Sequence, residues 1–136
     1  MIQWSEYHKK TLSKSPSLIL KKFFDMGLDD DINPKTAIDL GCGSGNDTVY
    51  LIKHNYSVVA VDKEKNVIEI IKNRVSENSK LDFIIDMFGG VKLSKTNLIV
   101  ANFSIPFCHP KYFSRFCKKI TDNINLGGYF CRKFFG

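Results

Sequence analysis

Five residues within one short stretch have types and spacings that suit a ligand site: Asp39, Gly41, Gly43, Gly45 and Asp62. Glycine adopts positive φ readily and has no Cβ, so the chain can turn sharply and a ligand can lie against the backbone. A helix that follows such a turn presents free N–H groups and a positive dipole end, which suit an anionic or polar ligand. Asp62 follows the first glycine by about 20 residues, where a carboxylate can accept both hydroxyls of a ribose. The stretch therefore predicts a nucleotide-binding turn.

The spacing of this turn differs from that of a dinucleotide site. The dinucleotide fingerprint is G-x-G-x-x-G, whereas here the third glycine arrives one residue early and Asn46 holds the sixth place. Asp39 stands two residues before the first glycine, where it would repel a pyrophosphate and attract a cation. A tight turn without a ligand would explain the glycines but not the two acids that frame them. The pattern favours a nucleoside ligand that carries positive charge and no phosphate.

The segment DLGCGSGNDTVYLIKHNYSVVAVDKE resembles class I S-adenosylmethionine-dependent methyltransferases, and within them the tellurite-resistance-type branch of small-molecule methyltransferases. The resemblance covers nearly the whole chain and implies S-adenosylmethionine as the cofactor. It also implies that the acid after the third strand, Asp86, bonds the adenine amino group. The cofactor-binding residues implied in this way are Asp39, Gly41, Gly43, Gly45, Asp62, Lys63, Asp86, Met87, Asn102 and Tyr7.

Hydrophobic patterns predict alternating strands and helices along the chain. Strands are expected at 36–40, 57–61, 81–85, 97–101 and 129–135, and helices at 2–13, 16–27, directly after the glycine turn, at 63–76 and at 110–123. Helical crossovers imply an α/β, Rossmann-like parallel sheet in the order 3-2-1-4-5, with helices on both faces. Against the resembled family, the chain lacks the usual last two strands. The glycine turn, Asp62, Asp86 and Asn102 would then meet at the carboxyl ends of the strands, where ligands bind.

Composition and length predict one domain. A chain of 136 residues with 43% hydrophobic residues can bury one core. We expect residues 1–136 to form a single S-adenosylmethionine-binding methyltransferase domain, with N-terminal helices in 1–28 that carry Trp4 and Tyr7 as a lid. No apolar run approaches the ~20 residues of a membrane span, so no membrane partner is expected. The four cysteines lack C-x-x-C spacing, which argues against zinc and favours a reducing cytoplasm.

The expected function is methyl transfer to a small-molecule soft nucleophile by in-line displacement. The sulfonium is already a strong electrophile, so alignment and water exclusion carry most of the rate. We assign no catalytic residue and no metal ligand; His109 is more often structural in such a position. Two alternatives stay open: a non-catalytic nucleotide-binding or interaction domain or fragment, supported by the missing strands, and a nucleic-acid methyltransferase. The latter is unlikely because only the net charge of +6 supports it, which a solvated helix face explains better.

The last predicted strand, 129–135, would be a sheet edge. It carries Phe130, Phe134 and Phe135, and an uncovered edge with large aromatic side chains invites pairing with another chain. The sequence therefore predicts that the chain self-associates through this edge or is only marginally stable.

Overall fold

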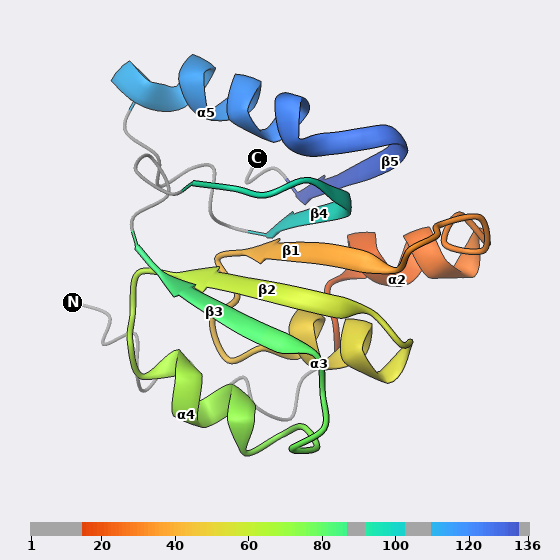
Figure 1. Cartoon of the computed structure of the whole chain (residues 1–136), viewed down its shortest axis with the longest axis vertical. Coiled ribbons are helices and arrows are strands. Elements are labelled where there is room, and N and C mark those ends of the chain that lie inside the picture. Colours follow the sequence, from red (N-terminus) through yellow and green to blue (C-terminus); the bar gives the residue numbers. More distant parts are fainter. Residues whose placement is uncertain (1–14, 87–91, 103–109, 134–136) are drawn as a thin grey trace.

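The computed structural model describes residues 15–86, 92–102 and 110–133, and the described strands form one parallel sheet. The strands are β1 (Thr36–Leu40), β2 (Ser57–Asp62), β3 (Leu81–Ile85), β4 (Thr96–Asn102) and β5 (Ile124–Lys133). Their order is β3-β2-β1-β4-β5, which Figure 1 shows from one edge of the sheet to the other. The predicted strand order and Rossmann-like α/β class are therefore confirmed.

Helices cover both faces of this sheet. They are α2 (Leu18–Asp25), α3 (Asn46–Lys53), α4 (Val67–Lys72) and α5 (Pro110–Asn123). Successive side chains of a strand point to opposite faces. Ala37 and Val58 pack with Leu51 of α3, whereas Ile38 packs with Ile120 of α5. α2 joins the first cluster through buried residues, and α4 covers Ala60 of β2. The core therefore has α2, α3 and α4 on one face of the sheet and α5 on the other.

Two helix boundaries differ from the predicted ones. α2 begins at Leu18 rather than at residue 16 and is capped by Ser17, whose hydroxyl accepts the N–H of Leu20 at 3.4 Å. The helix predicted over 63–76 is α4, which spans only Val67–Lys72. Its start is delayed because the Asp62 carboxylate accepts the N–H of Glu64 at 2.9 Å and holds the chain in a turn.

The fifth strand begins earlier than predicted and contains a bulge. Thr96 of β4 pairs with Ile124, but Leu98 pairs with Tyr129, so the residues between them bulge out of the ladder. Gly127, with φ of 84°, lies in this bulge. The residues directly before the predicted strand are thus an irregularity inside β5 rather than a break before it.

β5 is a sheet edge that is covered in part by α2. The Phe23 ring of α2 meets the Tyr129 ring edge-on, with centroids 5.1 Å apart. Tyr129 and Phe130 each remain 37% exposed, while Phe134 and Phe135 lie outside the described residues. No helix within the described ranges is long and apolar enough to cross a membrane.

Candidate functional site: a glycine-rich turn among buried acids

The carboxyl ends of the inner strands lie in register. Leu40 pairs with Val61 on one side and with Ala101 on the other, and Asp62 pairs with Ile85. The residues that follow these strands therefore leave the sheet at one edge, where the strand order reverses between β1 and β4. Gly41, Asp62, Asp86 and Asn102 all stand there, as the sequence predicted.

The glycine-rich turn uses the conformations that its glycines permit. Gly41, Gly43 and Gly45 have φ of 74°, 53° and 88°, in the region that L side chains rarely adopt. The N–H groups of Gly41 and Cys42 donate to the carbonyl of Val61 at 2.8 and 3.0 Å. The turn is thus tied to β2, and Gly45 then starts α3 as its N-terminal cap.

Asp62 connects three parts of the site. One carboxylate oxygen accepts the N–H of Gly43 at 2.9 Å, and the other accepts that of Glu64 at 2.9 Å. Its backbone carbonyl accepts the N–H of Asp86 at 3.0 Å. The side chain is only 7% exposed. Each carboxylate oxygen has a second lone pair, so Asp62 can still accept a ligand hydroxyl.

Three buried carboxylates surround the turn: Asp39, Asp47 and Asp62, which are 1%, 6% and 7% exposed. Asp39 accepts the hydroxyl of Thr48 at 2.6 Å, and Asp47 accepts the N–H of Ser17 at 2.7 Å. Every hydrogen-bond donor that these carboxylates have among the described residues is neutral. The turn therefore lies among acids that no lysine or arginine of the described chain compensates.

Burial and mutual repulsion disfavour the charged form of these acids. Burial, followed by the nearby Asp47 and Asp62 carboxylates, raises the pKa of Asp39 to about 8. Burial also raises the pKa of Asp47, and the hydrogen bond from Ser17 opposes that rise. A positively charged ligand would reverse this balance, because it favours the ionised acids.

Cys42 lies inside the turn, where its surroundings favour the protonated thiol. Burial, together with the Asp39 and Asp62 charges, raises the pKa of its thiol well above the ordinary range. The thiol therefore stays protonated, and the thiolate is the reactive form. No group of three His, Cys, Asp or Glu side chains in the described ranges is arranged to hold a metal ion.

The other predicted site residues divide into two groups. Lys63 and Asp86 are exposed at the ends of β2 and β3, and the backbone of Asn102 ends β4, where it pairs with Lys133. Tyr7 and Met87 lie outside the described residues, as do Trp4 and His109.

Sequence reasoning missed Asp47, although an acid in the first turn of a helix after a glycine turn is a recognisable signal. It also missed Ser17 and Arg74, which reach the turn only through tertiary packing.

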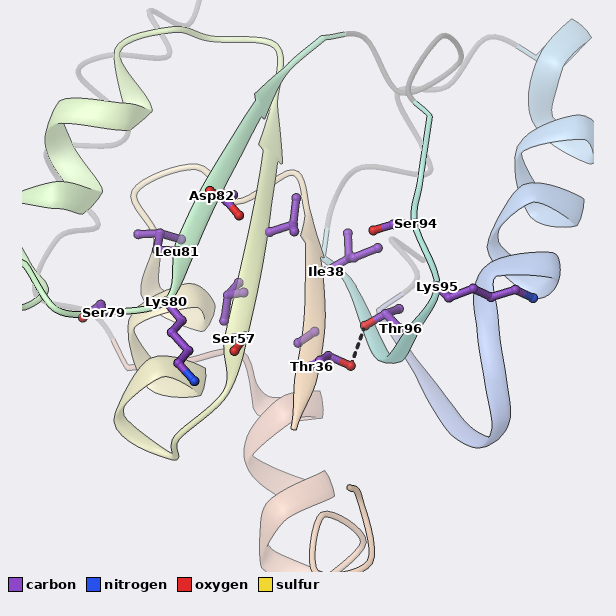
Figure 2. A pocket seen from close by; sticks show the side chains of 13 residues that line it. Thr36, Ile38, Ser57, Ser79, Lys80, Leu81, Asp82, Ser94, Lys95 and Thr96 are labelled. Atoms are coloured by element: carbon purple, nitrogen blue, oxygen red, sulfur yellow. Dashed lines mark hydrogen bonds between the residues drawn. The ribbon is translucent and has the colours of Figure 1, made fainter. Parts of the chain in front are cut away.

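A hollow of about 490 Å³ lies at the opposite end of the strands. Hydroxyl side chains from the starts of β1, β2 and β4 line it, and Figure 2 shows the bond between the Thr36 and Thr96 hydroxyls, 3.4 Å apart. None of the predicted site residues that the structure describes borders this hollow. It therefore belongs to the amino-terminal edge of the sheet and is separate from the glycine turn.

Comparison with known proteins supplies relatives for both the sequence and the fold. Residues 26–131 match the family model described as tellurite resistance protein TehB. A carboxy-S-adenosyl-L-methionine synthase of Nautilia profundicola is 31% identical over 96 residues, which cover 68% of this chain and 41% of that protein. A probable S-adenosyl-L-methionine-dependent methyltransferase TehB of Haemophilus influenzae is 27% identical over 101 residues, which cover 72% of this chain and 35% of the relative.

The fold is similar to that of solved methyltransferase structures, TehB among them. The crystal structure of TehB from Haemophilus influenzae superposes with a TM-score of 0.73 at 22% identity, covering 91% of this chain and 42% of that one. An S-adenosylmethionine-dependent methyltransferase from Clostridium acetobutylicum superposes with a TM-score of 0.72 at 18% identity. The match covers 93% of this chain and 53% of that one. The chain thus spans about two-fifths of the curated relatives' length.

Gly45→Ala tests how tightly α4 packs on the turn. A Cβ at Gly45 would lie 2.5 Å from Ile71 Cγ1, and φ of 88° adds backbone strain. We expect Gly45→Ala to lower the free energy of unfolding by about 2–5 kcal/mol, the sum of strain and overpacking. Gly127→Ala is the matched control, because Gly127 has φ of 84° with no atom within 4 Å of such a Cβ. Urea unfolding that gives equal losses for the two variants would contradict tight packing at Gly45.

Asp39 also predicts how stability depends on pH. The unfolded chain releases this proton near pH 4, whereas burial keeps it on folded Asp39 to about pH 8. Between these values the folded state holds a proton that the unfolded state lacks, so the free energy of unfolding should fall as pH rises from about 4 to 8. Asp39→Asn should reduce that slope, and Asp82→Asn, at an exposed position, should leave it unchanged. Chemical unfolding across this range gives the slopes, and equal slopes in all three proteins would refute the assignment.

Proposed function

Because the chain belongs to the TehB family of tellurite resistance proteins, we propose that it binds S-adenosylmethionine in the glycine-rich turn and transfers the methyl group to a small molecule. The observation that carries this proposal is the set of three buried carboxylates without a cationic partner among the described residues. S-adenosylmethionine brings a sulfonium and an ammonium and no phosphate. Its charges complement those of the site, whereas a pyrophosphate would be repelled.

The relatives support the cofactor more broadly than the reaction. Methyltransferases and carboxy-S-adenosyl-L-methionine synthases both appear among them, and S-adenosylmethionine or its derivative stands in both names. A site built for this molecule thus serves more than one chemistry. The methyltransferase assignment rests on the TehB relatives in particular.

The roles proposed for the site residues combine their chemistry with what the family resemblance implies. Asp62 accepts ribose hydroxyls while it holds the turn through Gly43, and Asp39 attracts the cationic part of the cofactor. Asp86 and Met87 border adenine, Lys63 lies beside the ribose, Asn102 lines the methionine part, and Tyr7 closes over the ligand within an N-terminal lid. Since the sulfonium needs no activation, the protein aligns a soft nucleophile with the methyl group and excludes water. No side chain is assigned as a general base.

A second candidate function is a reaction that modifies S-adenosylmethionine itself. The 31% identity to a carboxy-S-adenosyl-L-methionine synthase favours it. Product analysis separates the two functions: methyl transfer yields S-adenosylhomocysteine, whereas modification yields a heavier S-adenosylmethionine derivative. Binding without turnover would instead indicate a non-catalytic domain.

Asp62→Ala should weaken S-adenosylmethionine binding about 10- to 150-fold, which corresponds to the ~1.5–3 kcal/mol of hydrogen bonds to a charged group. The variant also loses the bond to Gly43, so the turn loosens in the same direction. Calorimetric titration measures the change, with Asp82→Ala as a control acid on the exposed part of β3. Normal affinity in folded Asp62→Ala would remove the ribose role.

We also propose that β5 pairs with a second copy of the chain through its free edge. Tyr129 and Phe130 are partly exposed there, and an edge strand presents unpaired backbone groups. Sedimentation should show a concentration-dependent dimer. Phe130→Lys should disrupt it, whereas Met26→Lys, which places the same charge at a 71% exposed position directly after α2, should not. A strictly monomeric protein at high concentration would show that other parts of the chain protect this edge.

A further inference from the structure

Arg74 contacts the glycine-rich turn from the segment that follows α4. It lies two residues past the end of α4, and its Nη1 donates to the carbonyl of Ser44 and to Oδ1 of Asn46, each at 2.8 Å. These partners lie 30 and 28 positions earlier in the sequence. One guanidinium nitrogen therefore joins the turn to the first residue of α3.

The two bonds lie on either side of Gly45, against which α4 packs closely. Gly45 lies between Ser44 and Asn46, and the missing Cβ of Gly45 makes room for Ile71. Ile71 is fully buried, and its carbonyl accepts the N–H of Arg74 at 2.9 Å, which ties Arg74 to the last turn of α4. α4 thus fixes the turn twice, by apolar packing beneath Gly45 and by charge-assisted bonds on either side of it.

The contact with Arg74 also fixes the orientation of the Asn46 side chain. Asn46 occupies the place of the third glycine in a dinucleotide fingerprint. Its amide oxygen accepts from Arg74, so it is directed to α4. Arg74 meanwhile donates to neutral oxygens and not to the Asp39, Asp47 or Asp62 carboxyl groups. We call the two hydrogen bonds from Arg74 to Ser44 and Asn46 the brace. The brace stabilises the turn without cancelling the negative charge beside it.

We propose that Arg74 is a positioning residue for the cofactor: it holds the 43–46 turn in the shape that binds S-adenosylmethionine before the ligand arrives. The inference rests on the proposed function. A protein whose binding-competent state is only fractionally populated loses apparent affinity by that fraction. Without the brace, part of the binding energy would be used to order the turn.

Hydrogen exchange in the ligand-free protein tests the brace directly. Arg74→Met retains the length and apolar character of the stem but removes both bonds. Backbone amides of residues 43–49 should exchange faster in this variant, while the amides of β1 and β2 keep their rates. Lys72→Met is the matched control, since Lys72 is exposed in the last turn of the same helix.

Calorimetric titration with S-adenosylmethionine tests the consequence for the cofactor. Affinity should fall about 10- to 100-fold in Arg74→Met, the range expected for bonds to a charged group. Asn46→Ala removes one of the two acceptors and should cause a smaller loss, and the double variant should lose less than the sum of the two. Arg74→Lys should recover part of the affinity, because an ammonium keeps the charge but not the planar fork. Arg74→Lys also tests the proposal if Arg74→Met does not fold.

The results separate the possible roles of Arg74. A merely structural role would lower the unfolding temperature yet leave both the exchange of the turn and the affinity of the folded variant unchanged, which would overturn the proposal. Wild-type protein that fails to bind S-adenosylmethionine would overturn the proposed function. Faster exchange of the turn in ligand-free Arg74→Met would still support the brace.

Discussion

The hydrogen bond from the Gly43 N–H to the Asp62 carboxylate is the contact on which the site depends. It joins the turn after β1 to the tip of β2, and the Asp62 carbonyl joins that tip to Asp86 at the end of β3. A turn with three positive-φ glycines has many conformations to lose, so it keeps one shape only if its surroundings determine it. Asp62 on the sheet side and α4 on the other provide that constraint.

The same site carries a cost to stability. Burying a carboxylate disfavours its charged form, and here three buried carboxylates lie around one turn with only neutral donors in the described chain. A core selected for stability alone would pair or replace them, because an uncompensated buried charge is strongly destabilising. A cation-binding site gains from the arrangement, since each acid gives up less hydration when the ligand arrives than an exposed acid would. Protonation of Asp39 in the free protein limits the cost until then.

The sequence predicted the elements that local pattern determines. The bounds of β1, β3 and α5 agree with the predicted ones, because their apolar runs and flanking turn residues are unambiguous. α4 is shorter because a side chain outside it, Asp62, captures the N–H of Glu64. The bulge in β5 depends on its pairing with β4, which no local pattern encodes. Arg74 could not be predicted as a turn contact, because its partners lie 30 and 28 positions away and only the packing of α4 brings them together.

Charge at the end of β1 separates two kinds of nucleotide site that share one fold. In a dinucleotide site the turn and the helix N-terminus together bind a pyrophosphate, and a carboxylate such as Asp39 would oppose it. Here Asp39 is buried next to the turn, and Thr48 of the following helix bonds its side chain. The start of α3 thus donates a hydroxyl hydrogen bond to Asp39 of β1. The backbone of the turn still suits a nucleoside, but the acids around the turn favour a ligand with positive charge. Asp39, the acid before the glycines, therefore indicates the kind of ligand more specifically than the glycines do.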